Sequence, residues 1–258
     1  MPLDLHLRRT HSLTVTVLGS AGTYPHPGNP CSGYLVQSPD TTVWLDAGTG
    51  TFGPLQQHVG LADVDAIVVS HEHPDHCLEL PVVRNAARYV FEINDIPVYG
   101  TAGTRELLEG LAGGPLDPPF RWTDVTDGST TQVGDISFRF SRTDHPVETL
   151  AVRAEANGRV FGYSSDTGAD WSFERLDPDR TGFDLVVCEA TLPHEQGGTY
   201  QHLTGTEAGA MCAAAQVRRL ALTHMYEGVE HDRLKEAEAP DAFGGPVEIA
   251  RPGYTFSV

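Results

Sequence analysis

Short apolar runs recur along the chain, and each ends in a polar or glycine-rich turn. This pattern predicts β-strands. The predicted strands are LTVTVL, GYLV, TVWLD, AIVVS, PVYG, ISFRF, LAVRA, RVFGYSSD, DLVVCEA and RLALTH. Helical character lies between several of them, notably over 78–91, 102–111 and 204–215. The last of these segments opens with Thr204 and carries Glu207 three positions on, which is the pattern of a capping box.

The order of these elements predicts the fold class. One run of strands with few helices is followed by a second such run, which favours two β-sheets packed face to face with helices outside them. We therefore expect an α/β protein built as a four-layer αββα sandwich. A chain of 258 residues suits one domain, 1–258, with the Gly/Pro-rich segment 113–120 as a loop inside it.

Charge and cysteine content narrow the classes of function. The chain has 35 acidic and 17 basic residues, for a net charge of −18. Such a chain repels polyanions, so long nucleic acid is a poor candidate substrate. The four cysteines are far apart and form no Cys-x-x-Cys motif, which favours a reduced cytoplasmic setting without disulfides. No apolar run approaches the roughly 20 residues that span a bilayer, and the run after the N-terminal arginine pair is interpreted as a strand, not an export signal.

Candidate chemistry is concentrated directly after the AIVVS strand. The segment SHEHPDHC places His71, His73, Asp75 and His76 within six positions. Imidazole and carboxylate ligands suit zinc, manganese or iron. A solvated loop that happens to carry histidines is the alternative, but four such side chains after a buried strand favour a metal site.

One metal ion does not account for this cluster. The adjacent Asp75 and His76 cannot easily turn to the same ion as His71 and His73, so a second ion is expected. Further candidate ligands follow other apolar runs, namely His145 in RTDHPVE, Asp166 in YSSDTG and His224 in LALTHM. A carboxylate such as Asp166 can bridge two cations roughly 3.5 to 4 Å apart.

These motifs resemble a known superfamily. SHEHPDH matches the His-x-His-x-Asp-His signature of the metallo-β-lactamase fold, and the resemblance extends from LTVTVLGSAG and TTVWLDAGTG to LALTHM. Within that superfamily the chain is most similar to the ribonuclease Z and phosphodiesterase branch, because YSSDTG, CEAT, HLTGTEAG and LALTH occur in that branch's order. It looks closest to an actinobacterial subgroup associated with cyclic-nucleotide phosphodiesterase activity.

The resemblance implies a role for each candidate residue. One ion would be bound by His71, His73 and His145, the other by Asp75, His76 and His224, with Asp166 as the bridge. A hydroxide between two divalent ions, with Zn²⁺ expected and Mn²⁺ or Fe as alternatives, would be the nucleophile, and Asp75 would orient it. Asp46 in LDAGTG resembles the carboxylate that steadies a ligand histidine, although a turn aspartate explains it equally well.

A second pair of residues bears on the reaction type. Glu189 in CEAT and His202 in QHLT match the pair that ribonuclease Z relatives use to protonate the leaving oxygen. Cys188 departs from the family, which usually has histidine there. Taken alone, His202 is better explained as a capping or surface histidine before the Thr204 helix. Lactonases and thioesterases of this fold need no such pair, so its presence favours a phosphodiester.

The substrate is expected to be small. Ribonuclease Z carries a long tRNA-clamping arm before the bridging aspartate, whereas His145 and Asp166 are only 21 positions apart here. We therefore expect a metal-dependent phosphodiesterase acting on a 3′,5′-cyclic nucleotide. The alternatives are a tRNA 3′ endonuclease, a hydrolase of another specialised cyclic phosphate, a lactonase or thioesterase, and a non-catalytic metal or ligand sensor. By position alone, the candidates for substrate-facing loop residues are Tyr24, His26, Tyr200, Met225 and Tyr226, although ordinary packing explains each of them better. A homodimer is a further option that the sequence does not decide.

Overall fold

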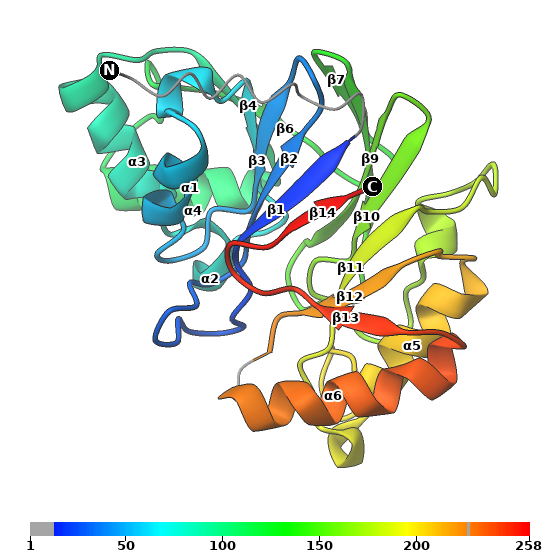
Figure 1. Cartoon of the computed structure of the whole chain (residues 1–258). Helices are drawn as coiled ribbons and strands as arrows, with labels where there is room; N and C mark the ends of the chain where they lie inside the picture. The colour runs from blue at the N-terminus through cyan, green and yellow to red at the C-terminus, as the bar shows by residue number, and fades with distance from the viewer. Residues whose placement is uncertain (1–12, 226–227) are drawn as a thin grey trace, which may run out of the picture.

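The computed structural model describes residues 13–225 and 228–258. Two seven-stranded β-sheets pack face to face, with helices on their outer surfaces (Figure 1). The predicted αββα sandwich is therefore confirmed.

The first sheet is formed mainly by the N-terminal half of the chain. In spatial order it comprises β14 (Thr255–Ser257), β1 (Thr14–Gly19), β2 (Gly33–Gln37), β3 (Thr42–Leu45), β4 (Ala66–Val68), β5 (Ile96–Gly100) and β6 (Phe120–Asp124). Pairing is antiparallel from β14 to β3 and parallel from β3 to β6. The parallel strands are connected by α1 (Phe52–His58), α2 (Pro74–Cys77), α3 (Leu80–Ala86) and α4 (Ala102–Ala112).

The second sheet repeats this order of pairing. It comprises β7 (Thr130–Val133), β8 (Ile136–Arg142), β9 (Leu150–Ala156), β10 (Arg159–Tyr163), β11 (Leu185–Glu189), β12 (Leu220–Thr223) and β13 (Val247–Ile249). Pairing is antiparallel from β7 to β10 and parallel from β10 to β13. α5 (Gly205–Ala214) and α6 (Gly228–Phe243) connect the last parallel strands. In each sheet the carboxyl ends of the parallel strands therefore lie along one edge. α/β proteins commonly bind ligands at such an edge.

Burial explains why these segments form these layers. Val15, Tyr34 and Phe138 lie in the core between the sheets. Two further apolar cores pack the outer faces against helices: one contains Trp44 and residues of α1, α3 and α4, and the other contains Val186 and residues of α5 and α6. Strands covered on both faces have continuous apolar runs for this reason, as in β11, which is buried throughout.

The sequence pattern misses several elements. β6, β7, β13 and β14 are not among the predicted strands, and neither α1 nor α6 was expected. The expected helix over 78–91 is divided into α3 and a π-helical turn, Ala87–Phe91. The capping box is confirmed: Thr204 Oγ1 accepts from the Glu207 amide, and the Thr204 amide donates to the Glu207 carboxylate.

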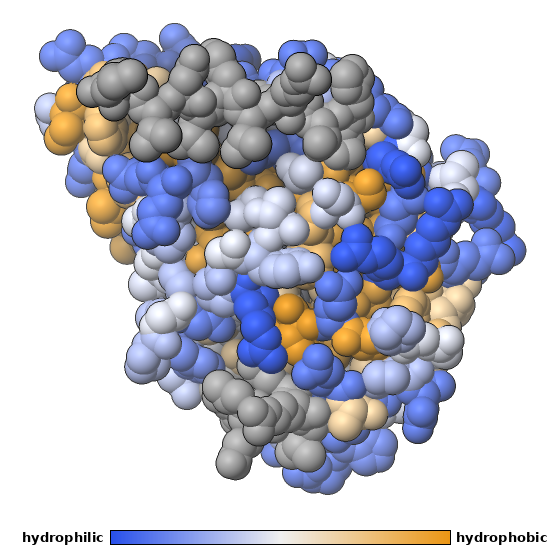
Figure 2. Space-filling view, in the orientation of Figure 1, coloured by the Kyte–Doolittle hydropathy of each residue, from blue (hydrophilic) through white to orange (hydrophobic). Residues whose placement is uncertain are grey.

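The surface is mostly hydrophilic in the view of Figure 2, where hydrophobic residues are visible at the upper left, over the region of α3 in Figure 1, and again near the centre. Val82, Tyr89 and Val90 are among the exposed apolar side chains. No helix in the described ranges is both long and apolar enough to cross a bilayer. All four cysteines are buried and free of disulfides.

Candidate functional site

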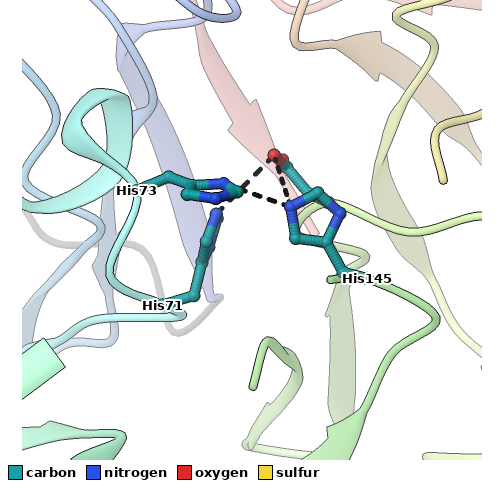
Figure 3. A group of neighbouring side chains, drawn as sticks. His71, His73 and His145 are labelled. Carbon is teal, nitrogen blue, oxygen red and sulfur yellow. Dashed lines mark hydrogen bonds and ion pairs between the residues drawn. The ribbon is translucent and has the colours of Figure 1, made fainter. Parts of the chain in front are cut away.

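All seven metal-ligand candidates converge in segments that follow strands of the two sheets. They form two groups whose ligand atoms lie within 4.8 Å of one another: His71, His73, His145 and Asp166 in the first, and Asp75, His76 and His224 in the second. Figure 3 shows the rings of His71, His73 and His145 directed toward one another.

The segment after β4 divides its side chains between the groups because a short helix begins within it. His73 is the N-cap of α2, and Pro74 occupies its first turn. Loops of the first sheet fix this helix: the Ser32 amide donates to the Asp75 carbonyl oxygen (3.1 Å), and the Ala47 amide donates to the His76 carbonyl oxygen (2.8 Å). Asp75 and His76 therefore face a different group from His71 and His73.

Asp166 lies between the two groups and turns one oxygen to each. Its Oδ1 is 3.2 Å from His76 Nε2 and 3.3 Å from His224 Nε2. Its Oδ2 is 3.7 Å from His71 Nε2 and 3.8 Å from His145 Nε2. This is the arrangement in which one carboxylate can contact two cations.

The donor set fits divalent metal ions. His71 Nε2 and Asp166 Oδ1 are buried, and neither has a hydrogen-bond partner among the described residues. Burial lowers the pKa of His71, and likewise of His73 and His145, which favours the neutral imidazole that binds metals.

The carboxylates around His76 also favour a bound cation, because they concentrate negative charge at this point. Burial opposes a charge on His76, but Asp166, Asp75 and Asp46 outweigh it and hold the pKa of His76 well above its ordinary value. The pKa of Asp75 is lowered despite its burial, because His76 and His224 stabilise its charge. A cation bound at this point can replace the proton.

The other ring nitrogens of the histidines are held by oxygen atoms. His76 Nδ1 donates to Asp46 Oδ2 (2.7 Å), and His71 Nδ1 donates to Ser70 Oγ (3.0 Å). His224 Nδ1 donates to Thr191 Oγ1 (2.7 Å) and His145 Nδ1 to the Gln201 carbonyl oxygen (3.2 Å). Such bonds fix the tautomer and leave Nε2 for a metal.

Asp46 is saturated by donors rather than free to bind an ion. Its carboxylate also accepts from the Ser70 amide (2.8 Å), the Ser70 hydroxyl (2.9 Å) and the Tyr163 hydroxyl (2.8 Å). The structure thus favours the role of a carboxylate that orients His76 over that of an isolated turn residue.

Glu189 and His202 form the pair expected from the sequence. His202 Nδ1 donates to Glu189 Oε1 at 2.8 Å. Glu189 is fully buried and also accepts from the Thr167 amide (2.7 Å) and the Thr191 hydroxyl (2.7 Å). Burial alone would lower the pKa of His202, but the Glu189 carboxylate outweighs this and raises it to about 9. The Glu189 carboxylate thus favours the protonated form of His202.

The ring of His202 lies next to the metal-ligand groups. Its centroid is 5.2 Å from that of His145 and 5.5 Å from that of His224, and it stacks on His224. Its side chain is 22% exposed, whereas that of Glu189 is 1% exposed. A partly exposed acid beside the metal groups is placed to reach a bound substrate.

Several residues of this network were not found from the sequence. Thr191 links Glu189 to His224, and Ser70 links His71 to Asp46. The Thr23 amide donates to Asp75 Oδ2 at 2.6 Å. Hydroxyls and backbone amides carry no compositional signal. Only the position of Ser70 at the end of a predicted strand, and of Thr191 directly after one, could have indicated them.

A pocket of about 700 Å³ opens beside the first metal group. Of the loop residues proposed by position, Tyr200 lines it. Met225 is buried, and Tyr24 is exposed with its ring against that of His26 at 4.7 Å. Tyr226 lies outside the described residues.

Comparison with known proteins agrees with this geometry. The family model described as the beta-lactamase superfamily domain matches residues 11–225. An uncharacterized protein of Mycobacterium leprae is 34% identical, covering 96% of this chain and 89% of its own. The ribonuclease Z of Methanopyrus kandleri is 26% identical, and the match covers 95% of this chain and 98% of its own.

A probable metallo-hydrolase of Bacillus subtilis, YhfI, is 29% identical, covering 95% of this chain and 99% of its own. The crystal structure of YhfI, described as a metallo-beta-lactamase fold protein, superposes with a TM-score of 0.86 and 26% identity, covering 96% and 100%. The chain thus belongs to the family described as the beta-lactamase superfamily domain, and it has the metallo-β-lactamase fold.

Proposed function

We propose that this protein is a metal-dependent phosphodiesterase that holds two divalent ions and hydrolyses a small phosphodiester, with a 3′,5′-cyclic nucleotide as the leading candidate. The observation that carries the proposal is the position of Asp166, whose two oxygens face two separate groups of ligands. Relatives named as a probable metallo-hydrolase and as ribonuclease Z support metal-dependent hydrolysis.

The ions, when bound, supply charge that stabilises the phosphoryl oxygens and lowers the pKa of water. His71, His73 and His145 would hold one ion, and Asp75, His76 and His224 the other. Asp75 Oδ2 accepts a hydrogen bond from the Thr23 amide (2.6 Å), which fixes the carboxylate so that it can accept a hydrogen bond from the attacking water. The protein therefore orients the nucleophile through Asp75.

His202 would protonate the leaving oxygen. Its Nδ1 is engaged by Glu189, so Nε2 is the nitrogen available to donate a proton. Glu189 keeps that proton on the ring at neutral pH by raising the pKa of His202 to about 9. An alkoxide leaves poorly without such an acid, whereas the thiolate of a thioester leaves readily, so the pair favours a phosphodiester over a thioester.

A small substrate is favoured over tRNA. Between His145 and Asp166 the chain forms only β9, a turn and β10, which leaves no segment there for a clamping arm. The net charge of −18 also opposes binding of a long polyanion.

The test is hydrolysis of bis(p-nitrophenyl) phosphate and 3′,5′-cyclic AMP by metal-loaded protein. We expect both to be cleaved, and we expect Asp75→Ala to reduce kcat for each by about 10²- to 10⁴-fold. His202→Ala should reduce kcat for 3′,5′-cyclic AMP by a similar factor but affect bis(p-nitrophenyl) phosphate much less, because p-nitrophenolate leaves readily without an acid. Asp179→Asn is the control, because Asp179 is exposed and lines a different pocket. Turnover of a lactone or thioester with neither phosphodiester cleaved would contradict the proposal, and metal binding with no turnover of any of them would favour a sensor.

A further inference from the structure

The pocket beside the first metal group is continuous with the proposed reaction site. His73, His145 and His202 line one part of it, and Asp144, Asp170, Tyr200 and Gln201 line another. Its volume of about 700 Å³ falls within the range of pockets that hold a small molecule. A phosphate held at the metal groups would therefore project one of its ester substituents into this pocket.

The charges that line this pocket away from the metal groups are negative. Apart from the histidines, the ionisable side chains among its described lining residues are Asp144, Asp170 and Tyr200, with no lysine or arginine. An anionic substituent would meet two carboxylates and find no counter-charge there. Like charges brought close together repel, most strongly at low ionic strength, whereas a neutral or cationic group meets no such cost.

Asp144 is held rigidly in this wall. Gln201 Nε2 donates to Asp144 Oδ1 at 2.7 Å, and the Gly168 amide donates to the Asp144 carbonyl oxygen at 2.7 Å. The Gln201 carbonyl oxygen accepts from His145 Nδ1, so the same residue holds both the wall and a metal-ligand candidate. A Cβ at Gly168 would overlap the Asp144 carboxylate, which shows how closely this loop approaches it.

Tyr200 adds an aromatic face to the same wall. It is 68% exposed and lies one residue before Gln201. Aromatic rings stack on planar groups and attract cations, so the ring complements the two carboxylates.

We propose that this pocket selects phosphodiesters whose second alcohol is uncharged or cationic and rejects those that carry a second anionic group. Asp144 and Asp170 are the residues that set this selection. The inference rests on the proposed function and narrows its substrate class: one negative charge, at the phosphodiester itself, and a substituent that donates hydrogen bonds or carries positive charge.

The experiment compares three p-nitrophenyl phosphodiesters that differ in the second alcohol: choline, its uncharged isostere 3,3-dimethylbutanol, and 4-hydroxybutanoate. At low ionic strength we expect kcat/KM for the anionic diester to be at least about tenfold below that of the uncharged one, with the choline diester at or above it. The binding affinities of the three corresponding phosphomonoesters should rank in the same order. Calorimetry measures these affinities without any turnover.

Substitutions of the two aspartates test whether their carboxylates cause the discrimination against the anionic diester. Asp170→Asn removes a charge from an exposed residue, and Asp144→Asn keeps an oxygen that can accept from Gln201. Each should raise the ratio of kcat/KM for the anionic diester to kcat/KM for the uncharged diester by about threefold or more, whereas Asp179→Asn, the matched control, should leave this ratio unchanged. Equal turnover of the anionic and uncharged diesters, or an unchanged ratio in both variants, would overturn the inference. If none of the three diesters is cleaved, the proposed function itself fails.

Discussion

Asp46 and Asp166 show how the surroundings of a residue decide its role. Both are buried, and both follow buried strands, β3 and β10. Asp46 accepts hydrogen bonds from Ser70, His76 and Tyr163, whereas Asp166 Oδ1 has no hydrogen-bond partner among the described residues. The first carboxylate can therefore orient a ligand, and the second is free to be one.

The pairing of Glu189 with His202 leads to a prediction about pH. Because the Glu189 carboxylate raises the pKa of His202, activity that needs the His202 proton is present at neutral pH and lost as the pH rises through about 9. Glu189→Gln removes the charge, so the pKa of His202 falls and the alkaline limb of the kcat/KM profile moves to lower pH. His202→Ala should lack this limb, and an unchanged limb in Glu189→Gln would show that another group causes it.

At the scale of elements, α2 depends on a loop that approaches its backbone closely. A Cβ at Gly48 would overlap the Asp75 carbonyl oxygen. Gly48→Ala should therefore displace α2 with its two metal-ligand candidates, lower stability by about 1–3 kcal/mol and weaken metal binding. The measurements are Tm and metal affinity by chelator competition.

Gly53→Ala is the matched control for Gly48→Ala. Gly53 lies in α1 with open space around its Cα, so an added methyl group should leave metal affinity unchanged and leave stability unchanged or slightly raised. If Gly48→Ala and Gly53→Ala had the same Tm and the same metal affinity, the argument that Gly48 must lie close to the backbone of α2 would be wrong.

The sequence predicted the elements that follow clear periodicities and missed those that do not. Strands buried in the sheets, such as β4 and β11, have continuous apolar runs, but β6 lies at a sheet edge with alternating exposure and a polar sequence, FRWTD. α6 escaped prediction because its sequence is highly charged and contains Pro240. At the site, clustered histidines and aspartates were recognisable, whereas the contacts of Thr191 and the Gln201 carbonyl depend on loops that only the fold brings together.

For the whole molecule, the metal groups concentrate buried charge in segments that follow strands of the two sheets. An ion present at about a thousand times its Kd stabilises the folded state by about 4 kcal/mol, which corresponds to a rise in Tm of roughly 8–16 °C for a domain of this size. We therefore expect a chelator to lower Tm by about 10 °C or more, as measured by calorimetry. In Asp166→Ala the same treatment should have a much smaller effect, and an equal effect in both proteins would argue against metal binding at Asp166.

Each metal group draws its members from both halves of the chain. His71, His73, Asp75 and His76 follow β4 of the first sheet, whereas His145, Asp166 and His224 belong to loops of the second. Neither half contains all the members of either group. The affinity for metal would therefore depend on how tightly the two halves pack together. Substitutions at their interface, even far from the site, would change metal affinity.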